Sequence, residues 1–336
     1  MDSMEYTLAE QIADVSVSRP HVVILGAGAS RAALPNGDRF GRRLPVMNDI
    51  VNLLGLEDLL ISAGVDPTRN FEELYSELSE STDRTQRDVL SSINARVDEY
   101  FSSLQLPDEP TIYDALVLSL RKKDLIATFN WDPLLWQAMV RNHSVAELPH
   151  VAYLHGNVAI GFCAKDHRKG FRGTACPECR QQYTPSRLLY PVTRKGYRTD
   201  EYISAEWDLL QRAMQDACIL TFFGYGAPAS DVEAVDLLRA GWGNVETREL
   251  EQTEIVDIRP EDDLLQTWDS FIHTHHHDVV SDFYETWQAR FPRRTCEVWF
   301  QQFIEAKLVT ENRIPLFHTL PELQSWFRPL IEAENG

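Results

Sequence analysis

Five short apolar runs in the chain are each followed by small or polar residues that could take part in chemistry. These residues are Gly26-Ala27-Gly28-Ala29-Ser30, Asn130-Trp131-Asp132, His155-Gly156-Asn157, Gly224-Tyr225-Gly226 and Asp257. If the runs are parallel strands, the groups that follow them meet at the sheet edge where open α/β sheets bind ligands. Glycines let backbone N–H groups approach a phosphate, and a histidine that titrates near neutral pH can accept a proton. The sequence therefore indicates a composite site with a candidate phosphate-binding turn and a candidate base, and an ordinary strand–helix turn is the alternative for the glycines.

The glycine segment does not by itself identify the nucleotide. Arg31 stands about where a dinucleotide-binding motif would have its third glycine. Asp49 is at a suitable distance for the acidic residue that binds a ribose, but it falls in a predicted helix and not at the end of a second strand. A simple dehydrogenase-type domain is therefore disfavoured.

Asp132 and His155 each have a structural interpretation that stays open beside ligand contact. Asp132 precedes Pro133, which is the pattern of a helix start with aspartate as the N-cap. His155 could be a core histidine that donates to a backbone carbonyl. Its position between a strand and a glycine favours a ring that faces a cleft.

The elements that must position these groups alternate between strands and helices. Strands are predicted at residues 21–25, 125–129, 151–154, 218–223 and 254–258, where short β-branched runs are bounded by turn residues. Helical patterns lie between these runs, and this alternation is typical of a mostly parallel sheet. The expected fold class is α/β, with a Rossmann-like sheet.

Two further stretches have helical patterns. Residues 44–120 are interpreted as a helical insertion, in which Thr111 caps a helix after two prolines. One helix face in this insertion is marked by Leu90, Ile93, Val97, Tyr100, Phe101 and Leu104. The residues from about 281 onward are also expected to be helical, in short pieces divided by Pro292, Pro315, Pro321 and Pro329.

The predicted organisation has three parts. Residues 1–20 form an N-terminal segment, residues 21–270 the catalytic domain and residues 271–336 a helical C-terminal region. The catalytic domain includes the insertion and a small cysteine-containing module at residues 157–196.

Composition limits the kinds of partner and compartment. The 336 residues carry a net charge of −19, with 51 acidic against 32 basic residues, so direct nucleic-acid binding is not expected. The acidic start MDSMEYTLAE lacks the apolar run of a signal peptide, and no apolar run is long enough to span a bilayer. Five cysteines do not suggest a disulfide framework. We expect a cytoplasmic protein without a membrane segment.

The motifs GAGAS, TFNWD, LHG, a cysteine cluster, FFGYG and VDIRP follow one another in the order found in sirtuins. Over residues 20–260 the chain resembles a divergent bacterial member of the sirtuin-like superfamily, and TxNxD with a following LHG is the most specific part. The resemblance implies that NAD is the ligand. It assigns the phosphate-binding turn to Gly26, Ala27, Gly28 and Ser30, phosphate and ribose contacts to Gly224 and Tyr225, and the adenosine ribose to Asp257.

The same resemblance assigns three catalytic positions. Asn130 matches the asparagine that holds the nicotinamide-side ribose and a water, and Asp132 matches the aspartate that contacts the nicotinamide amide. His155 matches the histidine that acts as base towards the ribose hydroxyls. Cleavage of the nicotinamide–ribose bond creates an oxocarbenium-like centre, which requires an oriented leaving group and a guided nucleophile.

Departures from the family pattern bear on the activity. Deacylating sirtuins follow the glycine turn with an apolar-acidic-Phe-Arg loop that closes over the nicotinamide, whereas this chain has RAALPNGDRF at residues 31–40. Phe129 also replaces the usual glutamine. The leading hypothesis is an NAD hydrolase, similar to NAD-degrading effectors of bacterial antiphage defence. An NAD-dependent protein deacylase and a non-enzymatic NAD or ADP-ribose sensor are the alternatives.

The resemblance extends to possible partners. Effectors of this type resemble subunits of larger complexes, so a homo-oligomer, a partner ATPase or another defence-system protein is expected. The helical tail and the acidic surface are compatible with such an assembly.

Cysteine and histidine spacing predicts a structural zinc site. Cys176 and Cys179 form half of a zinc knuckle, and Cys163 with His167 can complete four ligands for tetrahedral zinc. Three reduced thiols without metal are the alternative. The run from His273 to Asp278 is interpreted as a helix start or an oligomer interface, and Cys218 and Cys296 as core residues.

Overall fold

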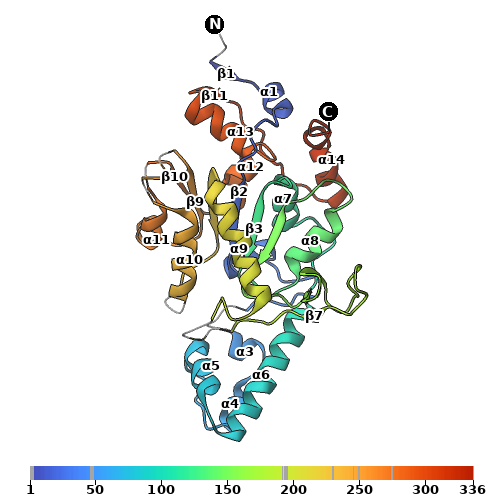
Figure 1. The fold of residues 1–336 in the computed structure, drawn as a ribbon, viewed down its shortest axis with the longest axis vertical. Coiled ribbons are helices and arrows are strands. Elements are labelled where there is room, and N and C mark those ends of the chain that lie inside the picture. Colours follow the sequence, from blue (N-terminus) through green and yellow to red (C-terminus); the bar gives the residue numbers. More distant parts are fainter. Residues whose placement is uncertain are drawn as a thin grey trace.

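A six-stranded sheet, in which all neighbouring strands run parallel, forms the centre of the computed structural model (Figure 1). The structure describes residues 4–45, 49–190, 192, 196–228, 231–244, 246–248, 250–273 and 275–335. The strands are β2 (His21–Leu25), β3 (Leu125–Thr128), β4 (His150–Tyr153), β8 (Ile219–Phe223), β9 (Gln252–Val256) and β10 (His277–Val280). Four of the five predicted strands agree within one residue, whereas β9 begins and ends two residues earlier than expected, and β10 was not predicted.

The order of the strands confirms the α/β, Rossmann-like class. Across the sheet they follow one another as β10-β9-β8-β2-β3-β4. The chain therefore runs outward from β2 to β4 and then returns to the other side of β2, which is the order of a doubly wound dinucleotide-binding fold. Its switch point lies between β2 and β8, where Leu25 is paired with Phe223.

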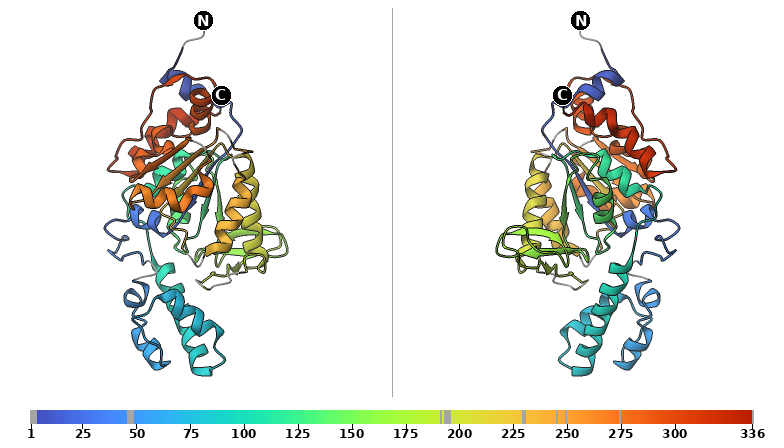
Figure 2. Two further views of the ribbon diagram at one scale, coloured as in Figure 1. Left: turned by 90° about the vertical axis from the view of Figure 1, so that its left-hand side faces the viewer. Right: turned by 90° about the vertical axis from the view of Figure 1, so that its right-hand side faces the viewer.

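Helices cover both faces of the sheet (Figure 2). On one face, α7 (Ile112–Ser119) packs against α8 (Leu134–Asn142) and α2 (Ala27–Ala33). On the other face, α9 (Glu201–Asp216) packs against α10 (Val232–Trp242). After β9 the chain continues through α11 (Glu261–Trp268) and the short turn η2 (Asp269–Phe271) into β10. Within the described residues, no helix has the length and apolar character that crossing a membrane requires.

Most of the predicted helical insertion projects from one end of the sheet (Figures 1 and 2). It contains α3 (Ile50–Leu53), α4 (Glu57–Ser62), α5 (Phe71–Glu80) and α6 (Arg84–Ser103). The predicted helix face is confirmed, because Ile93, Val97, Phe101 and Leu104 are buried. Thr111 caps α7 in a capping box with Asp114, as expected. However, α7 belongs to the layer beside the sheet rather than to the projecting helices.

The C-terminal region differs from the prediction in two respects. The predicted helix start in the histidine run is wrong, because His277 begins β10, a parallel edge strand paired with β9; Thr274 lies outside the described residues. The proline prediction also fails at Pro329, which lies inside α14 (Leu320–Glu332). The other elements here are η3 (Phe283–Glu285), α12 (Trp287–Arg290), α13 (Thr295–Trp299), the π-helical turn η4 (Phe300–Ile304) and β11 (Leu308–Val309).

Two smaller sheets complete the fold. At the N-terminus, β1 (Glu5–Tyr6) pairs in parallel with β11 and is followed by α1 (Leu8–Ala13). The cysteine-containing module is an antiparallel sheet of β5 (Ile160–Cys163), β6 (Arg168–Phe171) and β7 (Thr184–Pro185). Cys218 and Cys296 are fully buried, which confirms that they are core residues.

A buried polar network joins the central sheet to the C-terminal helices. Glu254 of β9 accepts hydrogen bonds from Thr221 Oγ1 (2.9 Å) and from the backbone N–H of Trp287 (2.7 Å). Thr221 Oγ1 lies 2.8 Å from His21 Nε2, and His21 Nδ1 lies 3.2 Å from Thr295 Oγ1. Burial raises the pKa of Glu254 to about 8 and lowers the pKa of His21 to about 3.

We expect Glu254→Gln to reduce the pH dependence of stability. An acid whose pKa is raised on folding stabilises the fold below its unfolded pKa, and this stabilisation is lost as pH rises towards about 8. The slope reaches about 1.4 kcal/mol per pH unit for one group. Urea unfolding between pH 5.5 and 8.5 should therefore show that the free energy of unfolding of the variant, relative to that of the unmodified protein, increases as pH rises. The exposed Glu305→Gln is the control, and parallel pH curves for all three proteins would contradict the prediction.

Candidate functional site

The loops that follow β2 and β8 touch through their backbones at the switch point of the sheet. The N–H of Gly26 donates to Phe223 O (3.0 Å), and the N–H of Gly28 donates to Gly224 O (2.9 Å). A Cβ atom on Gly28 would lie 2.7 Å from Gly224 Cα, and Gly224 itself has a φ of +61°. Glycine is therefore required on both sides of the contact. The predicted turn is present. Its Gly28 N–H is bound to the carbonyl of Gly224 and is therefore not free for a phosphate, whereas Ala27 at the start of α2 is exposed.

Four polar side chains form a buried cluster beside this contact. Ser30 Oγ donates to Asp132 Oδ2 (2.7 Å), and the hydroxyl of Tyr113 lies 2.6 Å from Ser30 Oγ. Asn130 Nδ2 donates to Ser30 Oγ (2.9 Å) and to Gly26 O (2.8 Å). The structure thus brings together Ser30, Asn130 and Asp132, as expected, and adds Tyr113 from α7. No local sequence pattern points to Tyr113, because it lies inside an apolar helix remote from every motif.

Asp132 accepts a backbone N–H at the start of α8, but the predicted N-cap role is wrong, because Pro133 is the N-cap residue of this helix. Asp132 Oδ1 accepts the N–H of Leu134 (3.1 Å), while Asp132 Oδ2 is bound to Ser30. Burial raises the pKa of Asp132 to about 6, against the opposing effect of these hydrogen bonds. The carboxyl group is therefore a strong acceptor that is mostly ionised at neutral pH.

His155 follows β4 and is enclosed by aromatic rings. Its Nε2 lies 2.7 Å from the hydroxyl of Tyr197, and only 7% of the residue is exposed. Phe129 meets the imidazole edge to face at 4.7 Å between ring centroids and stacks on Tyr225 at 4.2 Å. The partner observed for Nε2 is thus a side-chain hydroxyl, and the imidazole packs against the rings of Phe129 and Tyr197. Neither Phe129 nor Tyr197 was predicted to contact it.

Two other residues predicted to contact the ligand, Tyr225 and Asp257, are bound to side chains of the protein. The hydroxyl of Tyr225 donates to Asp231 Oδ2 (3.0 Å), and its ring is buried against Phe129. Asp257 follows β9, two strands away from β2, and its carboxylate binds the guanidinium of Arg259 (3.0 Å). A ligand would have to compete with these internal partners.

The segment 31–40 is anchored to the end of α6. The buried carboxylate of Asp38 accepts the backbone N–H groups of Phe40 and Arg42 (both 2.9 Å) and of Gln105 (3.1 Å). It also binds the guanidinium of Arg42. Asp38 thus fixes the loop to the base of the projecting helices and is not available to a ligand.

A cavity of about 990 Å³ lies between α5, α6, residues 186–190 and Val192. Tyr190, which lines it, packs against Trp131 at 5.0 Å between ring centroids. Asn130, Asp132 and His155 do not line this cavity. They are 9%, 4% and 7% exposed, so protein groups enclose them.

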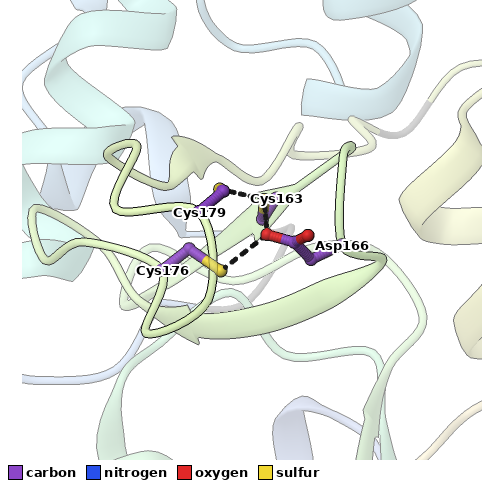
Figure 3. Close-up of side chains that lie close together, drawn as sticks. All are labelled: Cys163, Asp166, Cys176 and Cys179. Atoms are coloured by element: carbon purple, nitrogen blue, oxygen red, sulfur yellow. Dashed lines mark hydrogen bonds between the residues drawn. The ribbon is translucent and has the colours of Figure 1, made fainter.

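The predicted metal group is assembled with one change of ligand (Figure 3). Cys163, Asp166, Cys176 and Cys179 point toward one another, and their ligand atoms all lie within 4.8 Å. His167 is not part of this group, because its exposed ring lies 2.9 Å from Glu201 Oε1. His167 has a φ of +49° in the turn between β5 and β6. This turn brings the neighbouring Asp166 to the thiols instead.

The donor set fits a zinc ion. Tetrahedral zinc with Zn–S bonds of about 2.3 Å places sulfur atoms about 3.8 Å apart. The Sγ atoms of Cys163 and Cys179 lie 3.4 Å apart, and Cys176 Sγ lies 3.2 Å from Asp166 Oδ2. A carboxylate oxygen is an accepted fourth ligand. With four protein ligands, a bound zinc would stabilise the module and not act in catalysis.

The sequence matches no protein-family model, and no curated protein matches it. Among solved structures, the chain is similar to a Sir2 homolog–NAD complex, with 14% identity and a TM-score of 0.41, over 89% of this chain and 92% of that chain. It is also similar to Sir2 in complex with the inhibitor EX-527, 2′-O-acetyl-ADP-ribose and deacetylated p53 peptide. That similarity has 16% identity and a TM-score of 0.38, over 86% of this chain and 94% of that chain.

We expect Gly224→Ala to destabilise the protein by about 2–4 kcal/mol, because a methyl group adds both left-handed strain and overlap. The new Cβ would lie 2.3 Å from the backbone nitrogen of Ala29. Gly226→Ala is the matched control, since a Cβ there has no atom within 4 Å. Urea unfolding should separate the two variants, and equal stabilities would show that the loops can move apart without cost.

We expect the purified protein to contain about one zinc per chain, and a chelator to lower its melting temperature, because metal binding is coupled to folding of the module. Asp166→Ala should reduce the zinc content measured by elemental analysis, whereas His167→Ala should leave it unchanged. Zinc loss in the His167 variant but not in the Asp166 variant would reverse the assignment of the fourth ligand.

Proposed function

We propose that this chain is a sirtuin-like NAD hydrolase that releases nicotinamide and ADP-ribose. The observation that carries the proposal is the meeting of Ser30, Asn130 and Asp132 beside the switch point of a doubly wound parallel sheet. His155 follows the adjacent strand β4. These positions match the motifs that resemble sirtuins, and ligands of such sheets bind at this edge.

The reaction breaks the bond between ribose C1′ and the nicotinamide nitrogen, which takes the electron pair and leaves as neutral nicotinamide. Water adds to C1′ and releases a proton. We assign the orientation of the nicotinamide amide to Asp132 and the holding of the ribose and the water to Asn130. His155 accepts a proton from a ribose hydroxyl or from the water, a role that contributes about 10²–10⁴ in rate in enzymes generally.

Hydrolysis is preferred over deacylation because of the segment 31–40. Its sequence departs from the deacylase pattern, and Asp38 is engaged by Phe40, Arg42 and Gln105. A carboxylate used in this way serves to fix the loop. Hydrolysis needs only a water molecule at C1′, whereas deacylation also needs a binding site for an acylated peptide. Water is therefore the preferred nucleophile.

Several wider assignments form part of the proposal: the location and the zinc follow from composition and cysteine spacing, and the roles in defence and assembly follow from the resemblance. These assignments are NAD depletion in antiphage defence, a cytoplasmic location, homo-oligomers, and control by a partner ATPase or another defence-system protein. A structural zinc in the cysteine module belongs with them.

We expect the protein to release nicotinamide from NAD without a peptide, and His155→Ala to lower the turnover rate by about 10²–10⁴. Asn130→Ala should have a comparable effect. The matched control is His318→Ala, which removes an exposed histidine before α14. Nicotinamide release is followed by chromatography, with melting curves to confirm that each variant is folded.

The outcomes separate the three hypotheses. Release that depends strictly on an acylated peptide would replace hydrolysis with deacylation. Stabilisation by NAD without any release, alone or with candidate partners, would indicate a sensor. Undiminished release by folded His155→Ala would remove the role given to that residue.

A further inference from the structure

His155 is held by a residue outside every recognised motif. Tyr197 places its hydroxyl 2.7 Å from His155 Nε2, and the two rings stack at 5.6 Å between centroids. Tyr197 is completely buried, so the contact is sealed from solvent. The nitrogen that faces Tyr197 is therefore occupied by a hydroxyl of the protein.

A short turn ahead of α9 fixes the position of Tyr197. Gly196 has a φ of +62°, and its carbonyl accepts the backbone N–H of Thr199 (2.9 Å). Asp200 then caps α9 by accepting the N–H of Ile203 (3.0 Å). The ring of Tyr197 also packs against Trp207 of α9 at 4.9 Å between centroids. Movement of this turn would carry the phenol away from His155 without changing the central sheet.

The enclosure around His155 also contains a buried donor whose partner is missing. Trp207 is fully buried, and its Nε1 has no hydrogen-bond partner among the described residues. Buried donors are normally paired, so this arrangement is suited to admit a further polar group. The Trp207 ring packs against Tyr197 and Phe129, whose rings both meet His155, so this donor belongs to the residues that surround the Tyr197–His155 pair.

We propose that Tyr197 is a positioning residue that holds His155 in a resting state, and that a ribose hydroxyl of NAD replaces the phenol at Nε2. The inference rests on the proposed function, because it concerns the same base. In a two-state equilibrium, the apparent dissociation constant is the intrinsic value divided by the fraction of open molecules. Here the closed state is the one in which Tyr197 binds His155, and the open state is the one in which Nε2 is free to bind NAD. Stabilising the closed state therefore weakens NAD binding but leaves the chemical step of bound NAD unchanged.

The test is Tyr197→Phe, which removes the hydroxyl and keeps the ring. The lost hydrogen bond favours the open state, so KM for NAD should fall by about 3–10-fold while kcat stays within about two-fold. Tyr6→Phe is the matched control, since Tyr6 is also buried and donates to Asp14 (2.9 Å) on an N-terminal segment. It should leave both constants unchanged.

A second measurement does not depend on NAD turnover. Diethyl pyrocarbonate modifies accessible imidazole nitrogens, and peptide mass spectrometry can follow His155 against the exposed His318. Without NAD, Tyr197→Phe should speed the modification of His155 by about 3–10-fold relative to His318. Tyr6→Phe should not change this ratio.

Two results would overturn the inference. An unchanged modification rate in Tyr197→Phe would show that the phenol does not restrict His155. A fall in kcat with unchanged KM would instead make Tyr197 a group that acts during the chemical step. If no protein turns over NAD, the proposed function fails, while the modification rates still decide whether Tyr197 holds His155.

Discussion

The close approach of two backbone turns at the switch point is the constraint on which the site depends. Gly26 and Gly28 donate to the carbonyls of Phe223 and Gly224, so the ends of β2 and β8 are joined without side chains between them. The carbonyl of Gly26 is in turn the acceptor for Asn130. The position of the asparagine from β3 is therefore set by the same turn that closes the gap between β2 and β8.

Burial then determines the chemistry of the groups around this turn. Polar side chains in a low-dielectric interior must be paired, and their hydrogen bonds are stronger than in water. Ser30 is the centre of the cluster, because Asp132, Asn130 and Tyr113 all bind its hydroxyl. The same burial raises the pKa of Asp132. Within β9, Glu254 has a raised pKa for the same reason, but it joins the sheet to α12 and is not among the residues of the site.

The centre of the sheet was predictable, because β2, β3 and β8 are short, mostly apolar and fully buried. The edge strand β10 was missed since His277 and Asp278 are only half-buried and give no apolar run. Side chains that reach the site from remote helices or turns, such as Tyr113 and Tyr197, have no signature in sequence spacing. The metal ligand was assigned to His167 because histidine suits zinc. Spacing alone does not encode the backbone turn that brings Asp166 to the thiols instead.

The enclosed site places a requirement on any ligand that enters it. Each internal contact that the ligand breaks leaves a buried polar group, which costs about 1–3 kcal/mol unless the ligand supplies a new partner. At His155 the ligand must offer a hydroxyl in place of the Tyr197 phenol, and at Asp132 a donor in place of the Ser30 hydroxyl. Nicotinamide riboside carries both groups, an amide N–H and ribose hydroxyls, on one rigid framework. If the proposed function holds, a nucleotide without the amide would leave Asp132 without a replacement partner, so the cluster would favour nicotinamide dinucleotides over dinucleotides that lack the amide.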